Sequence, residues 1–199
     1  VFLMAGKPWH QRDPVRAKQM DERHATHALR ALELRKAFYG DYHELVAKDL
    51  FYSGGLIGKT DDEHARLLYD AIDMMRNTNR LNLNLPYMFE AYSAYLLFSK
   101  RPDTADVYLR VAALEAGETK YAAAERMLRE GLPLFRHHYP ENNIALLMNE
   151  CSLALALLKQ QKWQDFDEHY AICRKGLDLP PDPSGGIAGR IRLIENDPL

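Results

Sequence analysis

Large apolar residues recur every three or four positions along most of the chain, which is the pattern of helices that bury one face. Ala25, Ala65, Ala105 and Phe166 begin nearly the same motif, with a large apolar residue four positions later and a further apolar residue three positions after that. The interval from Ala25 to Ala65 is the same as that from Ala65 to Ala105. One such unit cannot bury its own apolar face, so the repeat predicts helices stacked as a solenoid, an architecture that favours binding over catalysis.

The periodicity predicts an all-α fold, because strand-like alternation is absent. Turn residues separate eight predicted helices, at 14–38, 42–57, 61–76, 86–99, 103–116, 120–137, 140–159 and 163–175. We expect a helical-repeat domain at 14–178 between an irregular N-terminal segment, 1–13, and an irregular C-terminal tail, 179–199. Pro180, Pro181 and Pro183 forbid a continuous helix in that tail, which has one short apolar stretch at 187–194.

Two helix boundaries can be predicted from their capping residues. Gly40 follows the first helix and suits the left-handed backbone that ends many helices. Thr60 and Glu63 form a capping box, in which the Thr60 hydroxyl accepts the N–H three residues on and the Glu63 side chain reaches back. The third helix is therefore expected to start directly after Thr60.

The segment at 53–60, Ser-Gly-Gly-Leu-Ile-Gly-Lys-Thr, nearly matches the phosphate-binding loop G-x-x-x-x-G-K-T. Its first position is Ser53 instead of Gly, the preceding residues fit a helix and not a strand, and Thr60 already serves as a helix cap. We interpret the segment as a corner between two helices, with Gly54 and Gly55 at a close helix crossing or an open groove floor. A P-loop nucleotide-binding protein that uses Lys59 is the less favoured alternative.

Other candidate chemistry is sparse. His24 and His27 lie one helical turn apart and residues 137 and 138 are both His, but zinc needs three or four converging ligands. We expect these histidines at the surface or its boundary. Acidic pairs such as Asp61 and Asp62 stand at helix starts, where they complement the helix dipole. The sequence therefore predicts no enzyme, no cofactor and no metal site.

Composition narrows the classes of partner. The chain has 199 residues, of which 47% are hydrophobic, and a net charge of -2 from 26 basic and 28 acidic residues. This balance argues against nucleic-acid binding by bulk electrostatics. No apolar run approaches the roughly 20 residues of a membrane span. The two cysteines, Cys151 and Cys173, fall inside helical segments, so we expect small buried residues and not a disulfide.

The N-terminal residues bear on location. Residues 1–6 are mostly apolar but lack a basic region, so they do not make a whole signal peptide and could be the remnant of one. Because residue 1 is Val, we interpret the chain as a fragment or a processed product. We expect a cytoplasmic protein, or a periplasmic one if the N-terminus is a processed signal remnant.

The last two helices resemble the tetratricopeptide repeat (TPR). The run Glu150-x2-Leu153-Ala154-x2-Leu157, then Trp163, Phe166-x3-Tyr170, Cys173 and Pro180, is similar to the repeat's W-x2-L-G-x2-Y, A-x3-F and Pro pattern. Two further units fit the same frame: Asp49-x2-Tyr52-Ser53-x2-Leu56 with Ala65-x3-Tyr69, and Phe89-x2-Tyr92-Ser93-x2-Leu96 with Ala105-x3-Leu109. The resemblance covers about residues 20–178.

The repeat interval in this chain exceeds the usual length of about 34 residues for the TPR and resembles the kinesin-light-chain type, common in bacterial signalling proteins. One irregularity stands out. Ala124-x3-Leu128 also matches the second-helix pattern, yet Ala124 follows Ala105 by only about half a period. Either the alternation of helices slips within 103–138, or one of the two matches is spurious.

The resemblance implies a right-handed α-α superhelix of about eight antiparallel helices, whose first helix in each unit lines a concave groove. The residues it places in the groove are Lys48, Tyr52, Tyr87, Glu90, Ala91, Ala94, Phe98, Met148, Ser152, Leu155 and Lys159. Aromatic anchors with scattered polar groups suit an extended peptide or a helix. Such tyrosines also serve as core or inter-repeat packing.

The resulting hypothesis is a non-catalytic scaffold that binds a protein or peptide ligand, as a regulatory part of a larger protein. The alternative is a sensor domain for a small signalling peptide or other small ligand, which would want a deep pocket instead of an open trough. A third possibility is purely architectural, with the solenoid spacing other domains or forming a homodimer through an exposed end, for example through the helix at 14–38.

Overall fold

Helices make up most of the described chain. The computed structural model describes residues 14–58, 60–98, 102–112, 118–178 and 186–196. This part contains a 3₁₀ turn, η1 (Lys175–Asp178), and no strand. Its α-helices are α2 (Pro14–Tyr39), α3 (Glu44–Ile57), α4 (Asp61–Thr78), α5 (Leu85–Phe98), α6 (Pro102–Ala112), α7 (Lys120–His138), α8 (Ile144–Leu158), α9 (Trp163–Arg174) and α10 (Gly186–Glu195). The all-α prediction is confirmed for these residues.

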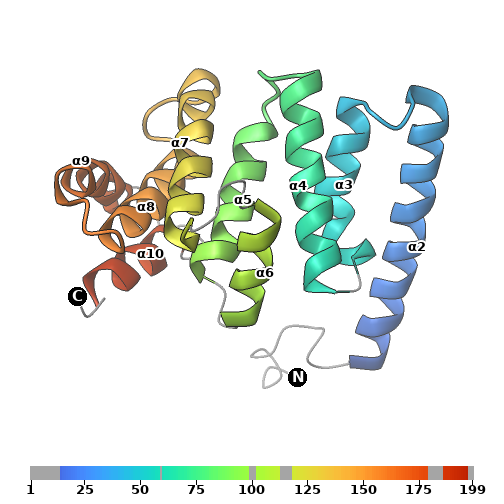
Figure 1. Cartoon of the computed structure of the whole chain (residues 1–199), viewed down its shortest axis with the longest axis horizontal. Helices are drawn as coiled ribbons and strands as arrows, with labels where there is room; N and C mark the ends of the chain where they lie inside the picture. Colours follow the sequence, from blue (N-terminus) through green and yellow to red (C-terminus); the bar gives the residue numbers. More distant parts are fainter. Residues whose placement is uncertain (1–13, 59, 99–101, 113–117, 179–185, 197–199) are drawn as a thin grey trace, which may run out of the picture.

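The helices stand side by side along the long axis of the molecule (Figure 1). Helix α2 is at one end and α8, α9 and α10 are at the other. Helix α3 packs mainly against its neighbours α2 and α4, and α8 packs mainly against α9. One large core runs from Leu32 of α2 to Leu157 of α8.

The middle of the row departs from simple alternation. The main partner of α5 is α7, not α6. Gly131 of α7 lies so close to α5 that an added Cβ would stand 3.3 Å from Phe89 Cβ. Helix α6 packs instead beside α4 and α5, where the Tyr92 hydroxyl donates to the Tyr108 carbonyl at 2.9 Å. The expected pairing of the 89–96 segment with Ala105 and Leu109 is therefore corrected, because α7 and not α6 is the helix that packs most extensively against α5.

The half-period irregularity has a simple explanation in this arrangement. In the pairs α3–α4 and α8–α9, the matched positions are separated by the same short interval, from 53 to 65 and from 154 to 166. The corresponding positions of α5 and α7, Ser93 and Ala124, are much further apart in the sequence. The interval from 93 to 124 is longer than the other two by the separation of Ala105 from Ala124. The additional residues lie in the segment between α5 and α7, which contains α6. Helix α6 is thus an additional helix between α5 and α7, which pack mainly against each other.

Both predicted caps are present. Gly40 has φ of 86° and its N–H donates to the Lys36 carbonyl at 2.9 Å. The Thr60 hydroxyl accepts from the Glu63 N–H at 3.2 Å, and the Glu63 carboxylate accepts from the Thr60 N–H at 3.2 Å. The capping box starts α4 at Asp61, as predicted.

The tail expected to be irregular contains helix α10. Three isoleucines, Ile187, Ile191 and Ile194, are buried in it, each with at most 6% of its surface exposed. Their spacing of four and three positions places them on one helical stripe. The prolines that argued against a helix all precede residue 186, so they limit where α10 begins without preventing it. Residues 1–13 and 179–185 lie outside the described part of the chain.

The expectation of two free buried cysteines is wrong. Cys151 of α8 and Cys173 of α9 are both fully buried, as expected, but they form a disulfide. The close packing of α8 against α9 brings the two Cα atoms to 4.8 Å, which is within the range that a disulfide needs. A covalent bond therefore joins the last two long helices.

Candidate functional site

The eleven predicted groove residues lie on α3, α5 and α8. We call this set of positions the α3–α5–α8 face. Its members differ sharply in surroundings. Lys48 and Tyr52 of α3 are exposed, with 61% of Tyr52 accessible, and Lys159 at the end of α8 is exposed as well. The remaining eight, on α5 and α8, are buried or half-buried.

Much of the α5 and α8 portion is covered by the chain's own helix α10. Ile187 and Ile191 pack in one cluster with the disulfide, against which Met148 also packs. Ile194 packs in a second cluster with Leu155, against which Phe98 packs. The apolar groove candidates Met148, Leu155 and Phe98 thus belong to, or pack against, the two clusters that contain the isoleucines of α10.

Arg190 of α10 connects the polar candidates. Its Nε donates to Ser152 Oγ of α8 at 2.9 Å, and its Nη2 donates to Glu90 Oε1 of α5 at 2.6 Å. Its guanidinium carbon lies 5.1 Å from the centre of the Phe98 ring, a cation–π contact. Only 12% of the Arg190 side chain and 17% of the Glu90 side chain are exposed, so this charge-assisted pair is shielded from solvent screening.

The α10 contacts were missed at the sequence level, although the apolar stretch at 187–194 was a usable signal. Its isoleucines follow the helical spacing, and of the two arginines within the stretch, Arg190 reaches α5 whereas Arg192 lies on the exposed side. The polar partner of Arg190, Glu90, is 100 residues away in the sequence. No local pattern indicates a pairing over that distance.

The remaining groove candidates of α5 are Tyr87, Ala91 and Ala94, all of which are half-buried. Tyr87 contacts α7, with its ring centre 5.2 Å from that of Phe135 and 5.9 Å from that of Tyr139. Burial raises the pKa of Tyr87, and a hydrogen bond to Tyr139 and the nearby phenol of Tyr52 raise it further. Tyr87 is thus a packing residue. Ala91 and Ala94 are half-buried on the same helix.

Tyr52 is the exposed aromatic of the α3 portion, and its position is set by a carboxamide network. The Tyr52 hydroxyl donates to Asn84 Oδ1 at 3.0 Å. Asn84 in turn donates through its side chain to Asn82 Oδ1 at 2.8 Å, and Asn82 donates to Glu44 of α3 at 3.2 Å. The Asn-rich segment before α5 therefore holds an exposed tyrosine ring in place at the surface.

The glycine-rich corner at 53–60 is a helix–helix crossing. Gly54 and Gly55 lie in the last turns of α3, and a Cβ on either would stand 3.4–3.5 Å from the His64 ring of α4. His64 Nδ1 is 2.8 Å from the Tyr108 hydroxyl of α6, and burial lowers the pKa of His64. The glycines therefore make room for a histidine that links α4 to α6. Lys59 lies outside the described residues.

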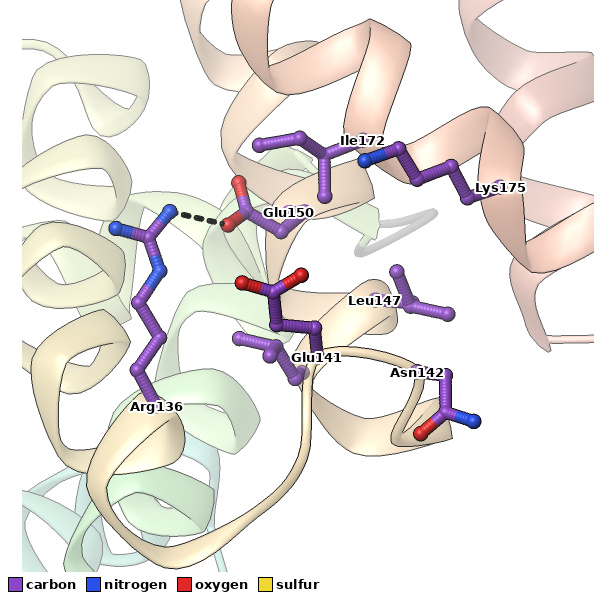
Figure 2. A pocket seen from close by; sticks show the side chains of 8 residues that line it. Arg136, Glu141, Asn142, Leu147, Glu150, Ile172 and Lys175 are labelled. Atoms are coloured by element: carbon purple, nitrogen blue, oxygen red, sulfur yellow. Dashed lines mark hydrogen bonds and ion pairs between the residues drawn. The ribbon is translucent and has the colours of Figure 1, made fainter.

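A second candidate site is a cavity of about 280 Å³ between α7, α8 and α9. Glu150, which is the only charged residue of α8, lines this cavity, and 1% of its side chain is exposed. Its carboxylate accepts from Arg136 Nη2 at 3.0 Å and lies 2.6 Å from His169 Nδ1. Figure 2 shows Arg136 and Glu141 reaching in from one side and Lys175 from the other. Charges of both signs thus line a small cavity. The feature of the sequence that could have indicated it is the single Glu in an otherwise uncharged helix.

The four histidines considered as zinc ligands do not line this cavity. His24, His27 and His137 are exposed, as expected, and His138 is half-buried with its Nε2 at 2.8 Å from the Leu81 carbonyl. Within the described ranges, no three His, Cys, Asp or Glu side chains converge as metal ligands would. Nor does any helix of the described chain combine the length and apolarity that crossing a bilayer requires.

The geometry thus offers two places where a ligand could be held: the α3–α5–α8 face and the cavity beside Glu150. The face has an exposed part at Lys48 and Tyr52 and a part covered by α10. The cavity has a buried carboxylate with cationic side chains around it. The chain matches no protein-family model and no curated protein sequence.

Proposed function

We propose that this chain is a non-catalytic scaffold that binds a protein or peptide along its α3–α5–α8 face, with its helices arranged as a TPR-like, right-handed superhelix. One observation carries the proposal: a short amphipathic helix, α10, is already seated on this face. The face supplies apolar contacts for a row of isoleucines and a shielded carboxylate for an arginine. These are the features by which a groove binds an amphipathic helix.

The exposed part of the face is accessible to a ligand even while α10 covers the rest. Tyr52 is a largely exposed aromatic residue whose hydroxyl donates to Asn84, and Lys48 stands one helical turn before it. Aromatic residues dominate the energy of many interfaces because they bury a large area with little loss of conformational freedom. We expect Tyr52 to be the main anchor for a ligand that approaches while α10 stays in place.

The disulfide bears on location. Disulfides persist in oxidising compartments and are rare in the cytosol. The bond between Cys151 and Cys173 therefore favours the periplasmic alternative, or another oxidising compartment, over the cytoplasm. Thiol titration of the protein purified from its native source under alkylating conditions would test this, since two reactive thiols would indicate a reducing compartment.

The binding proposal can be tested by selecting peptides from a displayed library against the full chain and titrating the best binders by fluorescence anisotropy. Tyr52→Ala should weaken them at least tenfold. Tyr42→Ala is the matched control, because Tyr42 is similarly exposed, at 54%, but lies in the connection between α2 and α3. The proposal is refuted if no selected peptide binds, or if the Tyr52 and Tyr42 variants behave alike.

A small-ligand sensor is the second candidate, and the cavity beside Glu150 favours it. A carboxylate flanked by Arg136 and Lys175 suits a small zwitterion such as an amino acid or a dipeptide, since both charges of the ligand could find partners. Calorimetric titration with amino acids and dipeptides tests this reading. Heat of binding that is lost in Arg136→Gln would support it, and an absence of heat for the whole series would reject it.

A further inference from the structure

We propose that α10 is an internal ligand that competes with the partner for the covered part of the α3–α5–α8 face. The partner is then an amphipathic helix with the pattern of α10. This pattern has apolar residues at positions i, i+4 and i+7 and an arginine at position i+3. In α10 these are Ile187, Arg190, Ile191 and Ile194. The inference rests on the proposed binding function and adds the class of partner and its regulation.

The packing of α10 is that of a docked segment. Its isoleucines join two small clusters with α8 and α9 and are not part of the large core that runs from α2 to α8. Its other side is exposed, at Arg192, Leu193 and Glu195. Its contacts with α9 and η1 are few: the Tyr170 hydroxyl donates to Glu195 at 3.0 Å, and Ile187 lies close over Gly176.

The helical conformation of α10 depends on its packing against α8. The helix has 10 residues, and isolated helices shorter than about 12–15 residues are marginal in water. A segment that is helical mainly because it is docked loses its structure when it leaves. Its release would expose Met148, Leu155 and Phe98 together with the Glu90 carboxylate.

The exposed surface would have a defined chemistry. It would present an apolar floor from α8 and α5, a carboxylate at Glu90 and a hydroxyl at Ser152, in the geometry that now holds the Arg190 guanidinium. A planar group with several N–H donors matches this pair better than the point charge of a lysine ammonium does. The surface therefore selects an amphipathic helix with arginine beside its apolar stripe.

The decisive experiment compares two charge reversals on the same helix in the full chain. Arg190→Glu places a carboxylate against Glu90, whereas Arg192→Glu makes the same change on the exposed side of α10. A fluorescent peptide of residues 186–196 is titrated into each protein by anisotropy. We expect Arg190→Glu to bind the peptide at least tenfold more tightly than wild type, and Arg192→Glu to match wild type. A peptide with Arg190→Glu should not bind.

Hydrogen exchange of α10 provides the second readout, with faster exchange expected only in Arg190→Glu. Arg190→Ala, which removes the ion pair without adding repulsion, should show the same changes to a smaller extent. Equal peptide affinity in wild type and all three variants overturns the inference. Loss of cooperative unfolding in both Arg190 variants also overturns it, because α10 would then be an integral part of the fold. The proposed function is tested separately at Tyr52, on the part of the face that α10 leaves exposed.

Discussion

The disulfide between Cys151 and Cys173 should contribute a measurable share of stability. The bond joins α8 to α9 across a loop of 22 residues and lies beneath Ile187 and Ile191 of α10. Reduction leaves both sulfur atoms in the same apolar cluster, so the contacts of the folded state change little. The main effect is on the unfolded chain, which gains conformational freedom when the loop opens.

The magnitude follows from the loop length. For a loop of 22 residues, the chain-entropy relation gives an entropy loss of about 11 cal/mol/K, or about 3 kcal/mol at 25 °C. For a chain of this length, each kcal/mol shifts the melting temperature by about 2–4 °C. Reduction should therefore lower the Tm by roughly 6–12 °C.

Urea and thermal unfolding, with and without reductant, measure this effect. The control is the double variant Cys151→Ala and Cys173→Ala, which should be insensitive to reductant and unfold near the reduced wild type. Equal midpoints for the oxidised and reduced wild type would refute the reasoning. So would the detection of two free thiols in the protein unfolded in denaturant without reductant.

Three further substitutions test local features by urea denaturation. Burial alone would raise the pKa of Glu125, but hydrogen bonds led by that from Lys162 at 2.6 Å hold it below its ordinary value of 4.5. The charged form therefore stabilises the fold above about pH 4.5, and this contribution is lost as pH falls through the folded pKa. Glu125→Gln should cost about 1–2 kcal/mol at pH 7 and progressively less toward pH 3, whereas a constant difference would contradict the linkage. Both amide atoms of Asn149 are buried without a partner among the described residues, so Asn149→Leu should stabilise by about 1–3 kcal/mol, and a loss of stability would show that the amide is satisfied. Gly40→Ala should destabilise by about 1–2 kcal/mol because of its φ of 86°, and an unchanged midpoint would contradict that strain.

The helices could be predicted well because their boundaries are local. Helix α7 spans 120–138 where 120–137 was expected, and α9 spans 163–174 where 163–175 was expected. The starts of α3 and α8 differ for one reason: a side chain later in the sequence is the actual cap. His43 Nδ1 accepts from the Leu45 N–H at 3.1 Å, and Asn143 Oδ1 accepts from the Ala145 N–H at 2.9 Å. These caps place the starts at Glu44 and Ile144 instead of 42 and 140.

The features that sequence reasoning missed all depend on partners far apart in the chain. The pairing of α5 with α7 skips the helix between them, α6, and the local sequence pattern at Ala105 of α6 is similar to that at Ala124 of α7. The disulfide requires two helices to be placed side by side before their cysteines can be seen to meet. The ion pair of Glu90 with Arg190 spans 100 residues. Periodicity reports which face of a helix is buried, but not what buries it.

The same limit explains why groove residues chosen for a ligand are contacted by the chain itself. The Glu90 carboxylate and the Phe98 ring both contact a guanidinium, and they would contact one in the same way whichever chain supplies it. The difference between α10 and a partner helix is therefore the covalent tether, which gives α10 an effective concentration on the order of millimolar. A free helix with contacts equal to those of α10 would displace it only at comparable concentration. A partner that acts at lower concentration needs contacts that α10 lacks, and the exposed Tyr52 ring of α3 is where the face offers them.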